Sequence, residues 1–317
     1  MGVFDGHTDL LCDVAARRLR GETDVFRRRH LDRFRAGGIE GGIFVIWVET
    51  PYQHDPASRA KQLMVCAAEE FAKSTALRLV RSCKELDDAV RDGVIYALIG
   101  VEGLDCIGGR LEGIDVLYAF GARTMMLTWN EVNALAAGAM SGDSGGLTPL
   151  GKRAVRHIQE RGILLDVSHL NDAGFRDVMG MTQAPVIASH SNCRSMCDVP
   201  RNLTDDQLRA IRDVDGVVGL NIYRGFVSRE PAEQTVEKLA EHAVRMIDIM
   251  GIDHVACGFD FCEFLEGESE ADASAGLKNC AQVPNLVACF ERMGMTRGER
   301  EKIALGNFHR VLRQVIG

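Results

Sequence analysis

The sequence predicts an α/β protein, an eight-stranded (β/α)8 or TIM barrel. Apolar runs of strand length alternate with helical patterns, eight such runs can be counted, and most of them are apolar throughout. Strands of this kind are typical of a parallel sheet covered on both faces or closed into a barrel, and the count of eight favours the barrel. The 317 residues suit one barrel with added loops. We therefore expect a single domain over residues 1–317, with additional helices at its C-terminal end.

The first half of the chain contains four of the expected strands. A short strand begins at Val3 and leads into His7-Thr8-Asp9. Three later apolar runs have the length of strands, and helical patterns stand between them. In chain order these are strand 41–48, helix 56–74, strand 94–101, helix 111–120 and strand 123–127.

The second half of the chain repeats this order, after a loop rich in Gly, Ala and Ser that runs to Gly146. The clearest helical pattern places Val236, Leu239, Ala243 and Met250 on one face. Two further helices are expected to close the chain. The elements before them are helix 149–161, strand 163–167, helix 172–179, strand 185–188, helix 205–213, strand 217–221, helix 236–250 and strand 254–258.

A doubly wound open sheet is the alternative fold for this alternation of strands and helices. Such a fold would place a glycine-rich phosphate-binding turn directly after the first strand. The first strand is instead followed by His7-Thr8-Asp9, which does not have that composition. The sequence therefore favours the closed barrel over the open sheet.

Ionisable side chains lie at the ends of five of the expected strands. In eight-stranded barrels the active site lies at the carboxyl ends of the strands, so these residues are expected to converge there. Each histidine has an alternative role as a hydrogen-bonded structural residue, and the glutamate could cap the segment that follows it. The residues are His7, Asp9, Glu102, His169, His190 and Asp260.

This set of residues predicts a site for two metal ions. Carboxylates confined to one small cavity would repel one another, and metal cations are the natural counter-charge. His7 and Asp9 are expected to bind the first ion and His169 and His190 the second. Glu102 can bridge the two ions, which would share a water or hydroxide that attacks a polarised carbonyl. An aspartate at the last strand end, Asp260, remains to take the proton and pass it to the leaving group.

Short motifs along nearly the whole chain resemble the renal or membrane dipeptidase family, zinc peptidases of the amidohydrolase-like, metal-dependent hydrolase barrels. These motifs have specific residue types at specific strand ends and loops. They are Asp5-Gly6-His7-Thr8-Asp9, Gly100-Val101-Glu102-Gly103, Leu127-Thr128-Trp129-Asn130, Gly146-Leu147-Thr148-Pro149-Leu150-Gly151, Leu165-Asp166-Val167-Ser168-His169, Ala188-Ser189-His190-Ser191, Arg201-Asn202 and Gly306-Asn307-Phe308.

The resemblance implies two Zn²⁺ ions, the first held by His7, Asp9 and Glu102 and the second by Glu102, His169 and His190. It also implies that Asp260 acts as acid and base. Arg201 is implied to hold the substrate carboxylate and Tyr223 to lie near the bound dipeptide. Trp129 and Asn202 are also expected at the substrate site. A planar guanidinium suits a carboxylate because it offers two parallel hydrogen bonds. The alternative for Arg201 is a surface arginine in the loop after Pro200.

The chain departs from the family pattern at two places. Mammalian members carry a histidine where this chain has Trp129, which could instead supply an aromatic wall or pack as an ordinary core residue. After Asp260 the family usually has Asp-x-Asp-Gly, whereas this chain has Asp260-Phe261-Cys262-Glu263. The first aspartate is kept, but the loop 262–282 is expected to shape the site differently.

Composition narrows the partners and the location. The formal net charge of −8 argues against nucleic acid as a main partner. No apolar run approaches the roughly 20 residues needed to cross a bilayer, and the start lacks the pattern of a secretory leader. The ten cysteines are scattered without Cys-x-x-Cys pairs, as expected for reduced thiols. We expect a cytoplasmic protein, and the resemblance allows a homodimer.

The principal functional prediction is a zinc-dependent dipeptidase for small dipeptides with free termini. The resemblance implies that it tolerates a D-amino acid at the C-terminal position. The alternative keeps both metals but acts on N-acyl amino acids or lactones. A third hypothesis, a catalytically silent binding protein on a retained barrel, is disfavoured because every expected strand end keeps its ligand or base.

Overall fold

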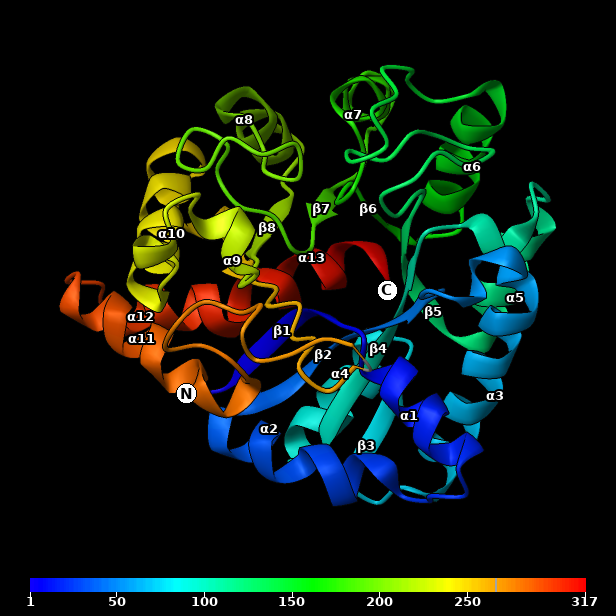
Figure 1. Cartoon of the computed structure of the whole chain (residues 1–317), viewed down its shortest axis with the longest axis horizontal. Helices are drawn as coiled ribbons and strands as arrows, with labels where there is room; N and C mark the ends of the chain where they lie inside the picture. Colours follow the sequence, from blue (N-terminus) through cyan, green and yellow to red (C-terminus); the bar gives the residue numbers. More distant parts are fainter. Residues whose placement is uncertain (266) are drawn as a thin grey trace.

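The computed structural model, which describes residues 1–265 and 267–317, has a central ring of parallel strands surrounded by helices (Figure 1). Eight strands follow one another in the order β1-β2-β4-β5-β6-β7-β8-β9, and β3 pairs with β4 outside this path. The strands are β1 (Val3–Thr8), β2 (Ile39–Trp47), β3 (Leu77–Val80), β4 (Ile95–Glu102), β5 (Ala122–Met126), β6 (Leu164–Asp166), β7 (Val186–Ala188), β8 (Val217–Leu220) and β9 (Val255–Cys257).

The first and last strands meet and bring the ring close to closure. Thr8 forms a parallel bridge with Phe261, and the backbone N–H of Asp260 donates to the carbonyl of His7 at 3.2 Å. The Asp5 carboxylate also accepts a hydrogen bond from the N–H of Phe259. The predicted eight-stranded barrel is therefore confirmed, with its seam between β1 and the segment after β9.

The helices cover the outside of the barrel, and several begin where a side chain caps the first turn. Thr148, Asn171 and Thr204 each accept a hydrogen bond from a backbone N–H of the first turn. The helices are α1 (Leu10–Leu19), α2 (Leu31–Gly37), α3 (Pro56–Lys73), α4 (Cys83–Asp92), α5 (Glu112–Phe120), α6 (Pro149–Glu160), α7 (Asp172–Met179), α8 (Asp205–Asp213), α9 (Arg224–Val227), α10 (Val236–Met250), α11 (Val283–Arg292), α12 (Arg297–Glu301) and α13 (Asn307–Val315).

The structure differs from the sequence prediction around β3 and at the C-terminal end. The short strand β3 and the helix α4 were not predicted, because β3 has only four residues and its two middle residues, Arg78 and Leu79, are partly exposed. Three helices rather than two, α11, α12 and α13, follow β9 in the described residues. None of the described helices is long and apolar enough to cross a membrane.

Two apolar layers hold the barrel together. An outer layer lies between strands and helices, and an inner cluster fills the ring with side chains such as Ile43, Leu164 and Val217. Helix α13 adds Phe308 to the inner cluster, where its ring lies 5.4 Å from that of Phe4, near the start of β1. This helix therefore covers the amino-terminal end of the barrel and leaves the carboxyl ends of the strands for the functional site.

Glycine permits a close backbone approach beneath the carboxyl ends of the last strands. A Cβ atom at Gly258 would lie 1.6 Å from the carbonyl oxygen of Ser189, and one at Gly219 would lie 2.0 Å from it. Real atoms do not approach so closely, so larger residues would push the strands apart. These two glycines set the tight spacing directly below His190.

Candidate active site

The structure brings the predicted metal ligands together at one end of the barrel. His7 and Asp9 lie at the end of β1, Glu102 ends β4, and His169 and His190 follow β6 and β7. All five are buried, with exposed fractions of 5% or less. The ring centroids of His7 and His190 are 3.9 Å apart, so the two imidazoles stand on the same rim.

Glu102 lies in the centre of the group, with its two oxygens turned to different partners. Its Oε2 is 3.3 Å from Nε2 of His7, and its Oε1 is 2.8 Å from Nε2 of His169 and 3.8 Å from Nε2 of His190. His7 Nε2 is also 3.9 Å from Asp9 Oδ1 and 3.8 Å from Asp260 Oδ1. Glu102 therefore lies between the two groups of side chains that the sequence predicts as ligands, with one oxygen toward His7 and the other toward His169 and His190.

Hydrogen bonds on the far side of two imidazoles orient them toward Glu102. Nδ1 of His169 lies 2.9 Å from the amide oxygen of Asn130, so the ring donates its Nδ1 proton there. Nδ1 of His190 lies 2.8 Å from the hydroxyl of Ser189. Both Nε2 atoms then point into the site, 2.9 Å apart, as metal-binding histidines do when their other nitrogen is hydrogen-bonded.

Two buried carboxylates fix the strand ends that carry these ligands. Oδ1 of Asp166 accepts from the N–H groups of Ser168 and Ser189, at 2.9 and 3.1 Å. Each serine directly precedes a candidate ligand, so one carboxylate sets the relative position of two histidines. Asp5 does the same at the seam, where its Oδ1 accepts from the N–H of His7 at 3.3 Å and from that of Phe259 at 2.8 Å.

Two residues of the site have a left-handed backbone. The φ angles of His169 and Asp260 are 68° and 63°, a region that residues other than glycine rarely occupy. Such conformations cost about 1–3 kcal/mol each and persist where the surrounding structure enforces them. With this backbone conformation, the side chain of His169 faces Glu102 and that of Asp260 faces His7.

The electrostatics of the site favour a bound cation. Burial and the neighbouring Glu102 raise the pKa of Asp9, and burial also raises the pKa of Asp260. Burial opposes ionisation of Glu102 as well, but His7 and His169 outweigh it and hold its pKa below its usual value. Three carboxyl groups thus lie close together at a largely buried site, where a positive charge among them would be stabilising.

The donor atoms fit the metal ions that the sequence predicts. Both ring nitrogens of His7 and Oδ1 of Asp9 are buried without a hydrogen-bond partner. Donor atoms of His7, Glu102 and His190 lie within 4.8 Å of one another, and so do donor atoms of His7, Asp9 and Asp260. Imidazole and carboxylate donors at these separations suit zinc or a similar divalent ion.

A cavity of about 330 Å³ opens onto the candidate metal ligands, and three of the predicted substrate residues line it: Arg201, Tyr223 and Trp129. Arg201 is only 3% exposed, its Nη2 donates to the carbonyl of His190, and its Nε has no partner. A buried guanidinium with unused donors beside a cavity is suited to an anionic group of a ligand. Tyr223 is 41% exposed, and Trp129 packs against Trp47.

Asn202 is the predicted substrate residue that the structure does not bring to this cavity. Its side-chain amide donates to the carbonyls of Cys197 and Phe226 at 2.8 Å, and its oxygen accepts from the N–H of Asn192. Asn202 is fully buried and does not line the cavity. Its hydrogen bonds hold the loop that carries Arg201.

Sequence reasoning missed several residues that the structure places at the site. Asn221, after β8, donates to Oδ2 of Asp260 at 3.0 Å, and Asn130 holds His169. Trp47, at the end of β2, lines the cavity together with Cys262, whose sulfur is 3.6 Å from Oδ1 of Asp260. Asn221 and Trp47 could have been found from their positions at strand ends, because strand ends predict site residues whether or not the side chain is ionisable.

Comparisons with known proteins agree with this geometry. The family model of the membrane dipeptidases, peptidase family M19, matches residues 1–316. A Klebsiella pneumoniae protein of unknown function encoded upstream of pqqA is 32% identical over 271 residues, which is 82% of this chain and 97% of that protein.

Solved structures of two metallopeptidases have the same fold over their whole length. A family M19 dipeptidase, named dipeptidase AC, has a TM-score of 0.89 at 28% identity and covers 100% of this chain and 99% of its own. A metallopeptidase from Rhodobacter sphaeroides, liganded with a phosphinate mimic of L-Ala-D-Ala, has a TM-score of 0.88 at 26% identity, with 99% of both chains covered. The chain therefore belongs to the membrane dipeptidase family, peptidase family M19, and is a metallo-dipeptidase.

Proposed function

We propose that this enzyme is a binuclear zinc dipeptidase that cleaves dipeptides with free amino and carboxyl ends. His7 and Asp9 would hold one zinc ion, His169 and His190 the other, and Glu102 would contact both. When bound, the two ions supply Lewis-acid activation of the scissile carbonyl and of the attacking water. The position of Glu102, with one oxygen toward His7 and the other toward His169 and His190, carries this proposal.

Arg201 and Asp260 perform the remaining steps. The Arg201 guanidinium binds the C-terminal carboxylate and places the peptide bond beside Glu102. Asp260 takes a proton from the attacking water and delivers it to the leaving nitrogen as the carbon–nitrogen bond breaks, so the products are two free amino acids. Asn221 keeps Asp260 in place through Oδ2 and leaves Oδ1 facing the site, 3.8 Å from His7.

We further propose tolerance for a D-residue at the C-terminal position. The Rhodobacter sphaeroides relative, which is liganded with a mimic of L-Ala-D-Ala, supports this reading. A cytoplasmic location and a homodimer remain proposals as well. The ten cysteines, all unpaired, are consistent with a reducing compartment.

Metal analysis and a dipeptide panel test the proposed function. Purified protein loaded with zinc is expected to hold about two zinc ions per chain and to cleave both Ala-Ala and L-Ala-D-Ala. Chelation should abolish cleavage, and zinc should restore it. A metal-free preparation that cleaves Ala-Ala at full rate would refute the metal assignment. An Ala-Ala methyl ester cleaved as fast as the free dipeptide would refute the role of Arg201 and favour a different amide substrate.

A further inference from the structure

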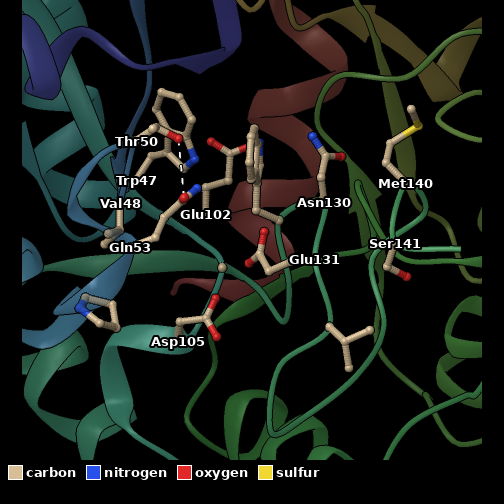
Figure 2. A pocket seen from close by; sticks show the side chains of 14 residues that line it. Trp47, Val48, Thr50, Gln53, Glu102, Asp105, Asn130, Glu131, Met140 and Ser141 are labelled. Atoms are coloured by element: carbon tan, nitrogen blue, oxygen red, sulfur yellow. Dashed lines mark hydrogen bonds between the residues drawn. The ribbon is translucent and has the colours of Figure 1, made fainter. Parts of the chain in front are cut away.

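A second cavity, of about 640 Å³, adjoins the candidate active site (Figure 2). Glu102 belongs to its lining, but the other proposed metal ligands and Arg201 do not. It therefore extends the site from Glu102 in a direction other than that of Arg201. The wall common to both cavities consists of Trp47, Glu102, Trp129, Asn130 and Met140.

The second cavity carries negative charge with no positive charge beside it. Figure 2 shows the carboxylates of Asp105 and Glu131 next to each other below Glu102. Burial, and then the contact with Asp105, raise the pKa of Glu131 to about 7. Within residues 1–265 and 267–317, the lining of this cavity contains no lysine, arginine or histidine beside the two carboxylates. Two carboxyl groups that repel each other would both gain from a cation between them.

The other walls suit a long aliphatic stem that ends in a positive charge. Trp47 and Trp129 stand with their ring centroids 5.3 Å apart, and aromatic faces attract cations. At the rim, Val132 and Met140 are 52% and 55% exposed, so apolar surface lines the entrance. Lysine and arginine combine an apolar stem with a cationic head, which matches a cavity with an apolar entrance and acidic interior.

The proposed function decides which part of the substrate reaches this cavity. With the C-terminal carboxylate on Arg201 and the scissile carbonyl at Glu102, the N-terminal residue lies against the common wall. Its side chain then has the second cavity in front of it. The C-terminal residue stays in the 330 Å³ cavity with Arg201 and Tyr223.

We propose that the 640 Å³ cavity binds the side chain of the N-terminal residue and selects lysine or arginine, with Asp105 and Glu131 as the specificity-determining residues. This inference rests on the proposed dipeptidase function. An acidic side chain is repelled by both carboxylates, and an uncharged one leaves them without a counter-charge. The expected order of kcat/KM is therefore Lys-Ala and Arg-Ala first, Leu-Ala next, and Glu-Ala last.

Competing dipeptides and charge-neutralising variants test this proposal on the zinc-loaded full chain. The ratio of kcat/KM for Lys-Ala to that for Leu-Ala is measured for the wild type, Glu131→Gln, Asp105→Asn and the double variant. Each single substitution is expected to lower the ratio about tenfold, as the loss of one charge contact to the cationic head implies. Glu112→Gln, which removes an exposed carboxylate on α5 outside both cavities, serves as the control and should keep the wild-type ratio.

The outcomes separate this inference from the proposed function. If zinc-loaded wild type cleaves no dipeptide of the panel, the dipeptidase function itself is wrong. If it cleaves Leu-Ala but prefers it to Lys-Ala, or if the ratio is the same in Glu131→Gln, Asp105→Asn and wild type, only the cation selectivity is overturned. Thermal unfolding of each variant identifies any that does not fold, and the remaining single variant then decides.

Discussion

Glu102 shows how one side chain can organise a site contributed by distant parts of the sequence. It ends β4, at the centre of the barrel mouth, and its two oxygens face histidines from β1 on one side and from β6 and β7 on the other. A glutamine could not replace it, because an amide offers only one oxygen and carries no charge. The whole division of the proposed metal site into two halves therefore depends on this carboxylate.

The role of Asp260 is tested by Asp260→Asn. Turnover of Ala-Ala is expected to fall by ~10²–10⁴, because asparagine cannot accept and return a proton. The hydrogen bond to Asn221 and the fold are expected to persist, so zinc content and thermal stability should stay near those of the wild type. Kinetics and metal analysis of the same preparation measure both effects. Turnover that matches the wild type would exclude Asp260 as the acid and base.

The role of Arg201 is tested by Arg201→Lys. A lysine keeps the positive charge but loses the planar pair of donors, so KM for Ala-Ala is expected to rise about 10- to 100-fold. Ala-Ala amide, which lacks the carboxylate, serves as the control substrate. Wild type should discriminate strongly between the two substrates and the variant weakly. Equal discrimination by both proteins would mean that Arg201 does not contact the carboxylate.

At this scale the sequence predicted the ionisable residues better than the neutral ones. His7, Asp9, Glu102, His169 and His190 follow strands, and parallel strands of a barrel end on one rim, so their convergence could be predicted. The supporting amides could not, because an asparagine at a strand end is as often a turn residue as a ligand support. Asn202 was predicted at the substrate site but does not lie there. Arg201 beside it lines the cavity, whereas the side-chain amide of Asn202 donates to backbone carbonyls.

Among the elements, β6 and β7 form a unit that Asp166 holds together. The strands have three residues each, so few ladder hydrogen bonds join them. The Asp166 carboxylate adds two, to the N–H groups of Ser168 and Ser189, just before His169 and His190. The short strands β6 and β7, which position His169 and His190, are therefore joined by hydrogen bonds from a side chain in addition to their few backbone hydrogen bonds.

The importance of this carboxylate is tested by Asp166→Ala. Two buried N–H groups would lose their acceptor, which costs about 1–3 kcal/mol for each group. We expect a lower free energy of unfolding and weaker binding of zinc at the His169 and His190 half of the site. Chemical denaturation and zinc titration measure the two effects.

Asp166→Asn provides the matched control, because its amide oxygen can still accept both hydrogen bonds. It should lose much less stability than Asp166→Ala. If the alanine variant unfolds at the same denaturant concentration as the wild type, the carboxylate does not hold the two strands.

At the scale of the whole molecule, the amino-terminal end of the barrel contains a pH-sensitive pair of side chains, His309 and Tyr96. His309 on α13 lies 2.6 Å, through Nε2, from the hydroxyl of Tyr96 on β4. Burial, and then the nearby Arg313, lower the pKa of His309 to about 4. An unfolded histidine has a pKa of about 6.5, so the unfolded chain binds more protons between these values. The stability that neutral His309 contributes is therefore lost as the pH falls from about 6.5 toward 4.

The variant His309→Gln tests this dependence. Wild type is expected to lose up to about 3 kcal/mol more stability between pH 7 and pH 4 than the variant does. Denaturant unfolding at several pH values measures the difference. A His309→Gln curve parallel to that of the wild type would contradict the prediction.

The overall architecture could be predicted because it depends on repetition, whereas its exceptions could not. Eight apolar runs separated by helices are enough to specify a barrel. The strand β3 has only four residues, too few to show a strand pattern in the sequence, and its pairing with β4 identifies it as a strand. The shapes of the two cavities depend on loops such as 129–141, whose backbone path is fixed by contacts with the segment after β6, among them the bridge between Gly138 and Leu170. The assignment of residues 1–317 to one domain stays a prediction.

The seam between β1 and the segment after β9 has a consequence for the part of the active site that depends on it. The proposed metal ligands lie between positions 7 and 190, whereas Asp260, the proposed acid and base, is held where the final strand meets the first. A local opening at this junction would displace Asp260 and release the contact of Asp5 with Phe259, while the candidate ligands that end β4 or follow β6 and β7 would stay in place. Loosening that one edge is therefore a way to switch turnover off without dismantling the rest of the molecule.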